Sequence, residues 1–540
     1  MYILSIKLSI NFVAINKVIL YDKNIKFLYK STWGDKMLSK IYSFGVNGID
    51  GYMVTVETHV SNGLSSVDIV GLADSSIKES RERVRSAIKN NSFTFPSSRI
   101  TVNLAPADVR KSGAVYDVPI MLGILESTGA IPKINPKFAF AGELSLDGYV
   151  RGINGALSMA LCAKENGITH IFLPAENANE ASVVEGVKIF AVEHITQIIN
   201  FLKDENSLIP YTYQPDLKTE IYPDFKDVKG QEEAKRALEI AASGLHNICL
   251  SGPPGSGKSM LAKRLPSIMP PISVEEAIET TKIYSMAGLL EKNSGLIKQR
   301  PFRSPHHSVS TAALTGGGPW AKPGEISLAH NGVLFLDELP EFHRDALEAL
   351  RAPLEDNRVV VARANSTHIY PSNIMLVGAM NPCPCGYLND DFHPCTCSSN
   401  QIERYKSKLS GPLMDRIDIF VNVASVKYEE LAGEDYTSES SEEILQRVLV
   451  ARQMQTERFK DTDITSNAAI PAAQIRQMCK TSKKAQAVLE KAFKSMGLSA
   501  RSYDKILKVA RTIADLEQSP LIEEMHMLEA VQYRNFDRKF

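Results

Sequence analysis

The segment GPPGSGKS, Gly252–Ser259, decides the fold of this chain. It satisfies the pattern G-x-x-x-x-G-K-[ST], follows the apolar run NICL and precedes the helical pattern MLAKRL. In a strand, glycine loop and helix of this order, backbone N–H groups at the helix N-terminus point at bound phosphate. The alternative is a glycine-rich turn that matches the pattern by accident, and it does not account for both flanks.

The residue types in this phosphate loop predict a site for ATP and Mg²⁺. Lys258 is expected to neutralise the β and γ phosphates, and the Ser259 hydroxyl is expected to coordinate Mg²⁺. Glycines allow the backbone to curl around the phosphates. The predicted nucleotide-binding residues of the loop are Gly252, Pro253, Pro254, Gly255, Ser256, Gly257, Lys258 and Ser259.

A second nucleotide-binding motif, VLFLDELPEF, lies downstream. Its four apolar residues predict a buried strand with two carboxylates at its end. Asp337 is expected to join the nucleotide site by holding Mg²⁺ through water, and Glu338 to polarise the water that attacks the γ phosphate. A strand that ends in a solvated acidic turn is the alternative.

Composition indicates a folded protein of several domains. The chain has 540 residues, 44% of them hydrophobic and 23% charged. Lys and Arg number 61 against 62 Asp and Glu, a net charge of −1, so no global positive field attracts nucleic acid or a membrane surface. Any DNA contact must therefore be local, in a groove or a pore.

Residues 1–36 differ in composition from the rest of the chain, with a bias to Ile, Asn and Lys. Lys7 and Lys17 interrupt the apolar residues before a membrane-spanning length is reached, and no small-residue cleavage site is present. We expect a disordered extension or a start-site artefact, with the working chain beginning at Met37. The expected location is the cytoplasm, with reduced cysteines and no membrane partner.

Residues 37–205 alternate strand and helix signals. YMVTVETHV predicts a strand, SSVDIVGL a buried strand, and SSIKESRERVRSAIKNN a helix capped at Asp74 or Ser75. A nucleic-acid patch on this helix is one interpretation, but interspersed Glu79 and Glu82 favour a solvated face. The basic residues concerned are Arg81, Arg83, Arg85 and Lys89.

Two segments of this block, RKSGAVYDVPIMLGIL and GELSLDGYVRGINGALSMALCAKENGITHIFLPAEN, resemble the proteolytic domain of the Lon protease family. The resemblance implies a Lon-like, ChlI-type domain with a ribosomal S5-like α/β fold. Val115 stands where that family carries its catalytic serine, and Leu157 where it carries the lysine. Neither side chain attacks a carbonyl or accepts a proton, so the resemblance implies the fold without the peptidase. A one-residue shift of the alignment would bring in Ser112 or Ser158 instead.

A proline-punctuated linker at residues 206–225 leads to an expected ATPase core at residues 226–425. Gly230 and Gln231 open a helix similar to the segment that wraps the adenine in AAA+ ATPases. In that family a polar sensor residue ends the strand NIMLVGAMN, and Asn381 matches it.

SGPLMDRIDIF resembles the arginine-finger segment of magnesium-chelatase-like AAA+ proteins. By this resemblance Arg416 reaches the γ phosphate of a neighbouring subunit, which implies a ring, a homohexamer. The alternative is a surface arginine paired with Asp415 or Asp418. With Glu338 and Asn381, Arg416 belongs to the expected catalytic set.

Three segments beyond residue 425 carry apolar residues at i, i+3, i+4 and i+7: EEILQRVLVARQMQTERF, KKAQAVLEKAFKSM and ARSYDKILKVARTIADL. The resemblance makes residues 426–540 a helical lid. Arg501 matches the second sensor of the family and completes the expected catalytic set. An ordinary arginine on a helix surface is the alternative.

Two insertions distinguish this ATPase from a minimal one. RPFRSPHHSVSTAALTGGGPWAKPGEISLAHNG resembles a hallmark of the YifB/ComM family, and its Trp320, beside Lys322, either stacks on bases, presses on a translocating chain or packs internally. RVVVARANSTHIYP predicts a β-hairpin, which in this clade projects into the channel of the ring. Arg363 is a candidate DNA contact there, and packing between subunits is the alternative.

A third insertion, at residues 383–397, concentrates cysteines in CPCGYLNDDFHPCTC. Thiolates at this density suit a closed tetrahedral Zn²⁺ site, although C-x-C is tighter than the usual C-x₂₋₄-C. His393 is a substitute ligand. The candidate ligands are Cys383, Cys385, Cys395 and Cys397.

The order of these segments from Met37 onward resembles the YifB/ComM family of AAA+ ATPases. The resemblance implies a cytoplasmic bacterial ring ATPase, and its competence-linked members act on branched DNA as branch-migration helicases. The competing hypotheses are a magnesium-chelatase motor subunit, an ATP-dependent protease and a remodeller of protein or nucleoprotein. The chain shows no D-x-S-x-S motif of the kind that favours the chelatase.

Overall fold

A computed structural model describes residues 38–215, 222–318, 321–363, 366–390, 392–425 and 438–534. The expected extension at residues 1–36 and Trp320 lie outside these ranges, as does the side chain of Arg363. The chain divides into two compact units. Unit 1 contains Gly51–Thr212 and the residues up to Gly45, and unit 2 contains Tyr213–Phe540 and the turn Val46–Asp50.

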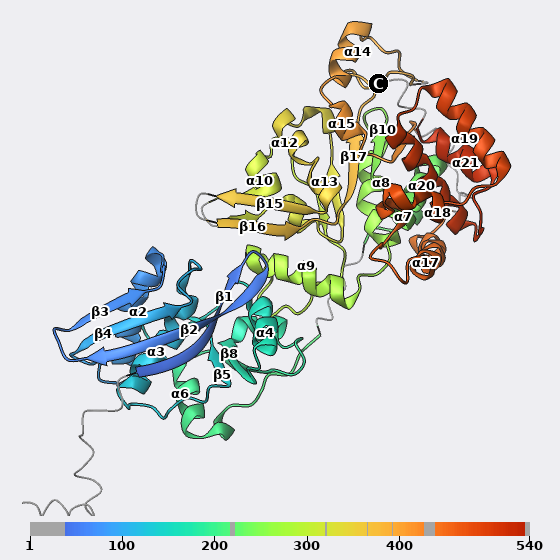
Figure 1. The fold of residues 1–540 in the computed structure, drawn as a ribbon. Coiled ribbons are helices and arrows are strands. Elements are labelled where there is room, and N and C mark those ends of the chain that lie inside the picture. Colours follow the sequence, from blue (N-terminus) through green and yellow to red (C-terminus); the bar gives the residue numbers. More distant parts are fainter. Residues whose placement is uncertain are drawn as a thin grey trace, which may run out of the picture. The chain divides into compact units, whose positions relative to one another are not determined.

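Unit 1 is built on a mixed seven-stranded sheet in the order β3-β4-β2-β1-β5-β8-β9 (Figure 1). Strand β4 pairs antiparallel with β2 and parallel with β3, whereas β1, β5, β8 and β9 run parallel. The strands are β1 (Leu38–Asn47), β2 (Asp50–Ser61), β3 (Ser66–Val70), β4 (Arg99–Ala105), β5 (Phe138–Phe140), β8 (His170–Pro174) and β9 (Lys188–Val192), with a separate pair β6 (Glu143–Leu144) and β7 (Val150–Arg151).

The expectation of a buried strand in SSVDIVGL is wrong. This strand, β3, forms the edge of the sheet and has no fully buried residue, because only β4 pairs with it. Its two predicted neighbours are confirmed: YMVTVETHV lies in β2, and SSIKESRERVRSAIKNN forms helix α2 (Ser75–Asn90). Asp74 caps α2 by accepting a 3.0 Å hydrogen bond from the Ile77 N–H.

The three arginines of α2 have partners within unit 1. Arg83 Nε lies 2.6 Å from the carboxylate of Asp117, which is fully buried at the start of α3 (Asp117–Ser127). Arg81 pairs with Glu82, and the Arg85 guanidinium lies over the ring of Phe95. The other helices of unit 1 are α4 (Ala156–Glu165), α5 (Ala178–Ala181) and α6 (Ile195–Lys203).

Val115 and Leu157, at the two positions compared with the Lon peptidase, are both buried aliphatic side chains. Val115 lies in a 3₁₀ turn, η1 (Ala114–Tyr116), and Leu157 in the first turn of α4. Ser158 is also buried, and Ser112 is exposed.

Unit 2 is built on a five-stranded sheet in the order β11-β14-β17-β10-β18, in which neighbouring strands pair in parallel. The strand that leads into the phosphate loop, β10, lies between β17 and β18, so β17 separates it from β14. All the carboxyl ends therefore meet at one edge. The strands are β10 (Ile248–Ser251), β11 (Phe302–Arg303), β14 (Val333–Leu336), β17 (Met375–Met380) and β18 (Ile419–Asn422).

Successive side chains of these strands point to opposite faces of the sheet, and a hydrophobic core lies on each face. Leu250 and Phe335 pack with helices α7 (Glu232–Gly244) and α8 (Lys258–Arg264) and with the C-terminal helices. Cys249 and Leu336 point the other way. That second face is covered by α9 (Val274–Ala287), α10 (Thr311–Thr315), α11 (Glu325–Leu328), α12 (Arg344–Ala349) and the hairpin of β15 (Arg358–Arg363) and β16 (Ser366–Pro371).

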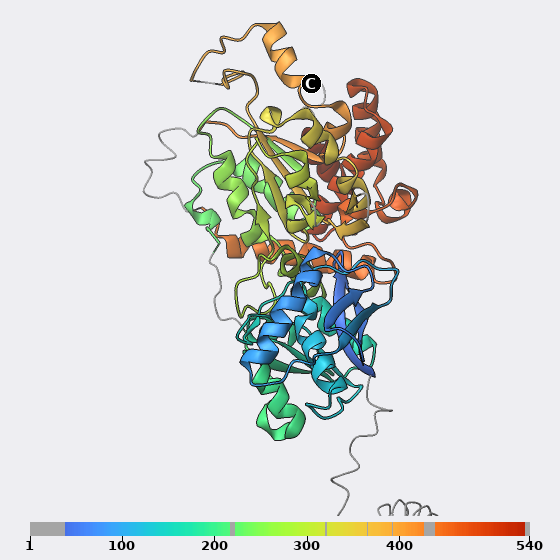
Figure 2. The same ribbon diagram turned by 90° about the vertical axis from the view of Figure 1, so that its left-hand side faces the viewer.

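The C-terminal segments form the helices expected from their periodicity. Figures 1 and 2 show them grouped beside the parallel sheet, coloured orange to red. The helices predicted from periodicity are α17 (Ser441–Arg458), α19 (Lys483–Met496) and α20 (Ala500–Leu516). The group also contains two helices that the periodicity does not predict, α18 (Ile475–Met478) and α21 (Glu524–Gln532).

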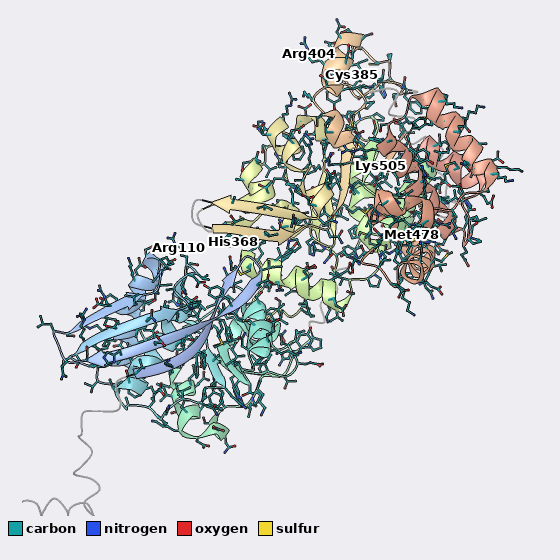
Figure 3. All side chains as sticks on the ribbon, viewed as in Figure 1. Arg110, His368, Cys385, Arg404, Met478 and Lys505 are labelled. Atoms are coloured by element: carbon teal, nitrogen blue, oxygen red, sulfur yellow. The ribbon has the colours of Figure 1, made fainter. Side chains whose placement is uncertain are left out.

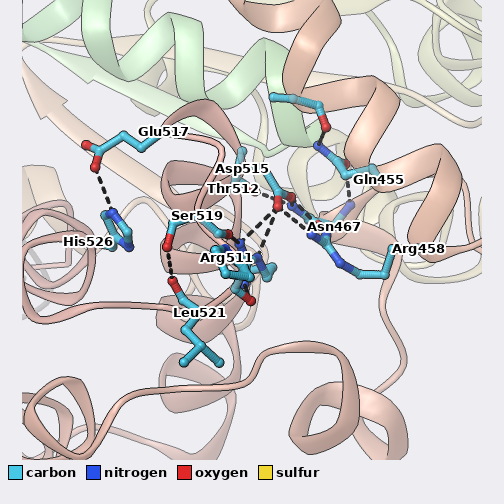
Figure 4. A network of polar contacts seen from close by, with 12 residues as sticks. Gln455, Arg458, Asn467, Arg511, Thr512, Asp515, Glu517, Ser519, Leu521 and His526 are labelled. Carbon is cyan, nitrogen blue, oxygen red and sulfur yellow. Dashed lines mark hydrogen bonds and ion pairs between the residues drawn. The ribbon is translucent and has the colours of Figure 1, made fainter.

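A buried polar network holds these helices together (Figure 4). The carboxylate of Asp515 is paired with Arg458 and Arg511 and accepts a 2.8 Å hydrogen bond from Asn467. Thr512 accepts a hydrogen bond from Asn467 and contacts His246, which follows α7. Gln455 donates to the carbonyl of Ser243 in α7, so the network reaches the first helix of the core. Buried charges are tolerated when they are paired and hydrogen-bonded in this way.

Candidate nucleotide-binding site

The phosphate loop adopts the conformation that its glycines permit. Gly255 and Gly257 have φ angles of +78° and +90°, in a region that side chains with a Cβ disfavour. Gly257 occupies the N-cap of α8, so Lys258 and Ser259 are the first residues of that helix. The loop thus directs backbone N–H groups and the positive end of a helix at one point.

Lys258 connects the loop to the neighbouring strand. Its ammonium donates hydrogen bonds to the carbonyls of Gly252 and Pro253, at 2.7 and 2.8 Å, and to Asn381 Oδ1 at 3.3 Å. Burial lowers the pKa of Lys258, and the nearby carboxylate of Asp337 acts against that shift. The geometry therefore brings Asn381, at the end of β17, to the lysine of the loop.

Ser259 and Asp337 meet across the sheet edge. The Ser259 hydroxyl donates a 2.6 Å hydrogen bond to Asp337 Oδ2, while Asp337 Oδ1 accepts the Glu338 N–H at 2.9 Å. A hydroxyl and a carboxylate are oxygen ligands of the kind that Mg²⁺ prefers. These two residues fit a Mg²⁺ site beside the phosphate loop.

Glu338 follows β14 in a left-handed backbone conformation, with φ at +50°. Its carboxylate lies 3.1 Å from His307 Nδ1, and the His307 ring packs 4.0 Å from that of His306. Both histidines belong to the insertion that begins at RPFRSPHH, and β11 of the same insertion forms the sheet edge beside β14. Glu338 therefore has a positioning neighbour that the motif alone does not reveal.

A cavity of about 400 Å³ opens at this edge of the sheet. One wall carries the predicted residues Lys258, Asp337, Glu338 and Asn381. Helix α14 (Ser399–Lys406) and its flanks form another wall of the cavity, with Gln401, Arg404, Tyr405 and Lys408. Glu341, Met380 and Pro384 complete the lining.

The four cysteines of residues 383–397 converge. Their sulfur atoms all lie within 4.8 Å of one another, with Cys383 Sγ 3.3 Å from Cys385 Sγ and 3.7 Å from Cys395 Sγ. Hydrogen bonds from the backbone N–H groups of Tyr387 and Thr396 lower the pKa of Cys385 to about 6. Burial raises that of Cys383 to about 12. Four thiols in one cluster fit a structural zinc site.

His393 stands apart from this sulfur cluster. Its Nδ1 lies 3.1 Å from Asp390 Oδ2, and its ring packs against that of Tyr387. The metal-capable group found among the described residues consists of the four cysteines alone.

Comparison with known proteins accounts for almost the whole of this architecture. Family models described as "Magnesium chelatase, subunit ChlI", "Subunit ChlI of Mg-chelatase" and "Magnesium chelatase, subunit ChlI C-terminal" match residues 224–431, 56–177 and 438–534. Competence protein ComM of Haemophilus influenzae is 42% identical over 510 residues, covering 92% of this chain and 97% of that protein. The uncharacterized protein YifB of Escherichia coli is 41% identical, covering 93% and 98%.

The chain belongs to the YifB/ComM family. This membership confirms a magnesium-chelatase-like AAA+ domain and implies ATPase activity with ATP and Mg²⁺. Likeness to Lon proteases is partial: Lon protease 2 of Bacillus subtilis is 26% identical over 274 residues, covering 44% of this chain and 47% of that protein.

In this YifB/ComM-family chain, two of the predicted catalytic residues do not line the cavity. The Arg416 guanidinium is ion-paired with Glu355 and donates hydrogen bonds to the carbonyls of Arg351 and Pro412. Its partner is thus neither Asp415 nor Asp418. Arg501 lies exposed in the first turn of α20.

Sequence reasoning missed His307 and the α14 wall. The signals available were the adjacent histidines of RPFRSPHHSVS and the i, i+4 spacing of Arg404 and Lys408 after the cysteines. Neither pattern specifies which distant carboxylate or cavity it faces. In the described part of the chain, no helix has both the length and the apolar character needed to cross a bilayer.

Proposed function

We propose that the chain is an ATP-hydrolysing ring motor that moves branched or single-stranded DNA in recombination or natural transformation. The observation that carries the proposal is the convergence of Lys258, Ser259, Asp337, Glu338 and Asn381 at one sheet edge. Lys258 would bind the β and γ phosphates, and Ser259 and Asp337 would hold Mg²⁺, which supplies charge stabilisation at the phosphates when bound. Glu338 would activate the attacking water, which Asn381 would orient.

The proposed ring follows from where the arginines lie. Arg416 and Arg501 both stand outside the cavity that contains Lys258. An arginine that stabilises charge on the γ phosphate must reach it, so we infer that a neighbouring subunit supplies Arg416. The inferred assembly is a homohexamer in which residues 426–540 act as the lid and contribute Arg501.

DNA as the polymer has two supports. One relative that matches over nearly its whole length is named a competence protein. The hairpin of β15 and β16 pairs over six residue positions, and its strands carry Arg358 and Arg363. We propose that this hairpin, together with the sequence segment around Trp320, faces the channel and contacts DNA. The proposed place of action is the bacterial cytoplasm.

The domain organisation proposed is a Lon-like domain at 37–205, a linker at 206–225, the ATPase core at 226–425 and the lid. We infer that the Lon-like domain has no peptidase activity, because Val115 and Leu157 are buried and have no nucleophilic or basic group. Its role would be in binding or assembly. The four cysteines would hold a structural Zn²⁺.

A single experiment separates the DNA motor from a protease. Full-length protein is given ATP and Mg²⁺ with a labelled four-way junction, and in parallel with unfolded casein. We expect junction migration that is lost in Lys258→Ala, with casein left intact. Casein cleavage would overturn the account of Val115 and Leu157. ATP turnover without any effect on the junction would leave a different polymer as the substrate and refute the DNA assignment.

A further inference from the structure

Helix α14 forms a cationic wall of the cavity that contains the ATPase residues. The helix starts directly after the cysteine segment, and Ser398 and Gln401 close its N-terminus with a reciprocal capping box. Arg404, Tyr405 and Lys408 line the cavity from this side. Figure 3 labels Arg404 on α14, near Cys385 at the same end of the unit.

Two contacts fix the position of this wall. The Tyr405 phenolic oxygen accepts a hydrogen bond from the backbone N–H of Asn381, and Tyr405 is buried. Lys408 Nζ lies 2.9 Å from both carboxylate oxygens of Glu341 and 5.6 Å from the centre of the Tyr405 ring. Helix α14 is thereby tied to the end of β17 and to the segment after β14.

Charge distinguishes Arg404 from its neighbours. Lys258, Arg404 and Lys408 face Asp337, Glu338 and Glu341 in the cavity. Lys408 is neutralised by Glu341, and Lys258 belongs to the phosphate loop. No ion pair of Arg404 occurs among the residues that the structure describes, and the residue is exposed to solvent.

The location of the cavity specifies which end of a nucleotide Arg404 would meet. Glu338 and Asn381, the residues expected beside the γ phosphate, line the same space. Gln231, on the expected adenine side, does not line it, and its amide donates to the carbonyls of Ala424 and Ser256 at 2.6 and 3.3 Å. In a nucleotide bound with this orientation, a guanidinium on this wall would face the terminal phosphate rather than the base.

We propose that Arg404 contacts the γ phosphate of ATP bound to its own subunit and makes the site selective for a triphosphate over a diphosphate. The proposal rests on the proposed ATPase function and adds a cation in cis to Arg416, the arginine expected from the neighbour. A guanidinium offers paired N–H donors that match phosphate oxygens, and charge-assisted hydrogen bonds of this kind are strong.

The test compares nucleotide affinities of full-length wild type, Arg404→Ala, Arg404→Lys and Lys406→Ala. Lys406 supplies a cation on the same helix but does not line the cavity. Affinities for ATPγS and ADP are measured by calorimetry, together with kcat and KM for ATP. For Arg404→Ala we expect about tenfold weaker ATPγS binding, corresponding to one charge-assisted contact, with ADP binding unchanged and kcat reduced. Arg404→Lys should recover part of the loss, and Lys406→Ala should match wild type.

Equal weakening of ATPγS and ADP in Arg404→Ala, or no change in either, would overturn the proposal, because only a γ-phosphate contact discriminates between them. If Arg404→Ala does not fold, the same comparison on Arg404→Gln decides the question. Wild-type protein that binds ATPγS but does not hydrolyse ATP would refute the proposed function, while the binding comparison would still test Arg404.

Discussion

The backbone of Gly386 lies directly against the ring of Pro254. A Cβ added to Gly386 would stand 2.5 Å from Pro254 Cδ and 2.8 Å from Cγ, and Gly386 has a φ of +89°. This contact joins the cysteine segment to the phosphate loop. Asn381 precedes the cysteine segment and α14 follows it. The positions of both therefore depend on a segment that also contacts the phosphate loop.

We therefore expect Gly386→Ala to weaken ATP binding. The added methyl group must displace the Pro254 ring, and overpacking of this kind costs about 1–3 kcal/mol. If this free energy destabilises the ATP-bound conformation of the phosphate loop, the KM for ATP should rise roughly tenfold or more. Gly497→Ala is the matched control, because Gly497 also has a positive φ, +63°, but open space around its Cβ position. Similar ATP kinetics in the two variants would argue against a link between the segments.

Glu338→Gln is expected to retain ATP binding and lose hydrolysis, by about 10²–10⁴-fold for a general base. Arg416→Ala is expected to lose hydrolysis as well, because the γ phosphate then lacks its finger. Mixing the two inactive variants should restore part of the turnover, since some interfaces then combine an intact Glu338 with an intact Arg416. Steady-state ATPase of mixtures at varied ratio measures this, and a flat zero across all ratios would rule out the shared site.

The ion pair between Asp418, next to strand β18, and Lys505, in helix α20, is expected to make folding stability depend on pH. Burial alone would raise the pKa of Asp418, but Lys505, at 2.6 Å, and His246 outweigh burial and lower it. The pKa of an aspartate in the unfolded chain is about 3.9, and the pKa of Asp418 in the folded chain is lower. The stabilisation by this carboxylate is therefore fully present above the unfolded-state pKa and is lost as the pH falls toward the folded-state pKa. Wild-type stability should therefore show no Asp418 transition between pH 5 and 8.

Lys505→Met should remove about 3 kcal/mol of unfolding free energy at pH 7, because it leaves Asp418 largely buried with one partner fewer. Its loss should shrink as the pH falls, since the protonated carboxyl needs no cation. Urea denaturation at pH 7 and at about pH 3, below the ordinary pKa of an aspartate, measures the effect, with Lys491→Met, an exposed position of α19, as control. A deficit that is the same at both pH values would count against this ion pair as its source.

Metal content tests the cysteine cluster. We expect purified protein to contain about one Zn²⁺ per chain by elemental analysis, and Cys395→Ser to lose it. Chelation should lower the melting temperature, because metal binding contributes to folding stability. Cys162→Ser, outside the cluster, is the control. Purified wild-type protein without stoichiometric zinc would show that the four cysteines do not form a zinc site.

The local motifs are predictable from sequence because each is contiguous. The phosphate loop, the strand before Asp337 and the strand before Asn381 are specified by neighbours in the chain, and the structure has each of them. The apolar residues of β3 wrongly predict a buried strand. Apolar residues alone do not indicate whether a strand has neighbours on both sides, and β3 pairs with β4 alone.

Contacts between residues far apart in the sequence are not predictable, because they depend on tertiary packing rather than on neighbours in the chain. His307 meets Glu338 only because β11 adds to the sheet beside β14. Arg404 lines the cavity from α14, which Tyr405 and Lys408 anchor to distant parts of the chain. The pairing of Arg416 with Glu355 likewise depends on tertiary packing, and spacing alone suggests the adjacent aspartates instead.

ATP hydrolysis by the full chain, measured with Mg²⁺ in the presence and absence of four-way junction DNA, tests the central claim most directly. The account predicts turnover that DNA stimulates and that Glu338→Gln abolishes while nucleotide still binds. Turnover that is indifferent to DNA, or that persists in Glu338→Gln, would contradict it.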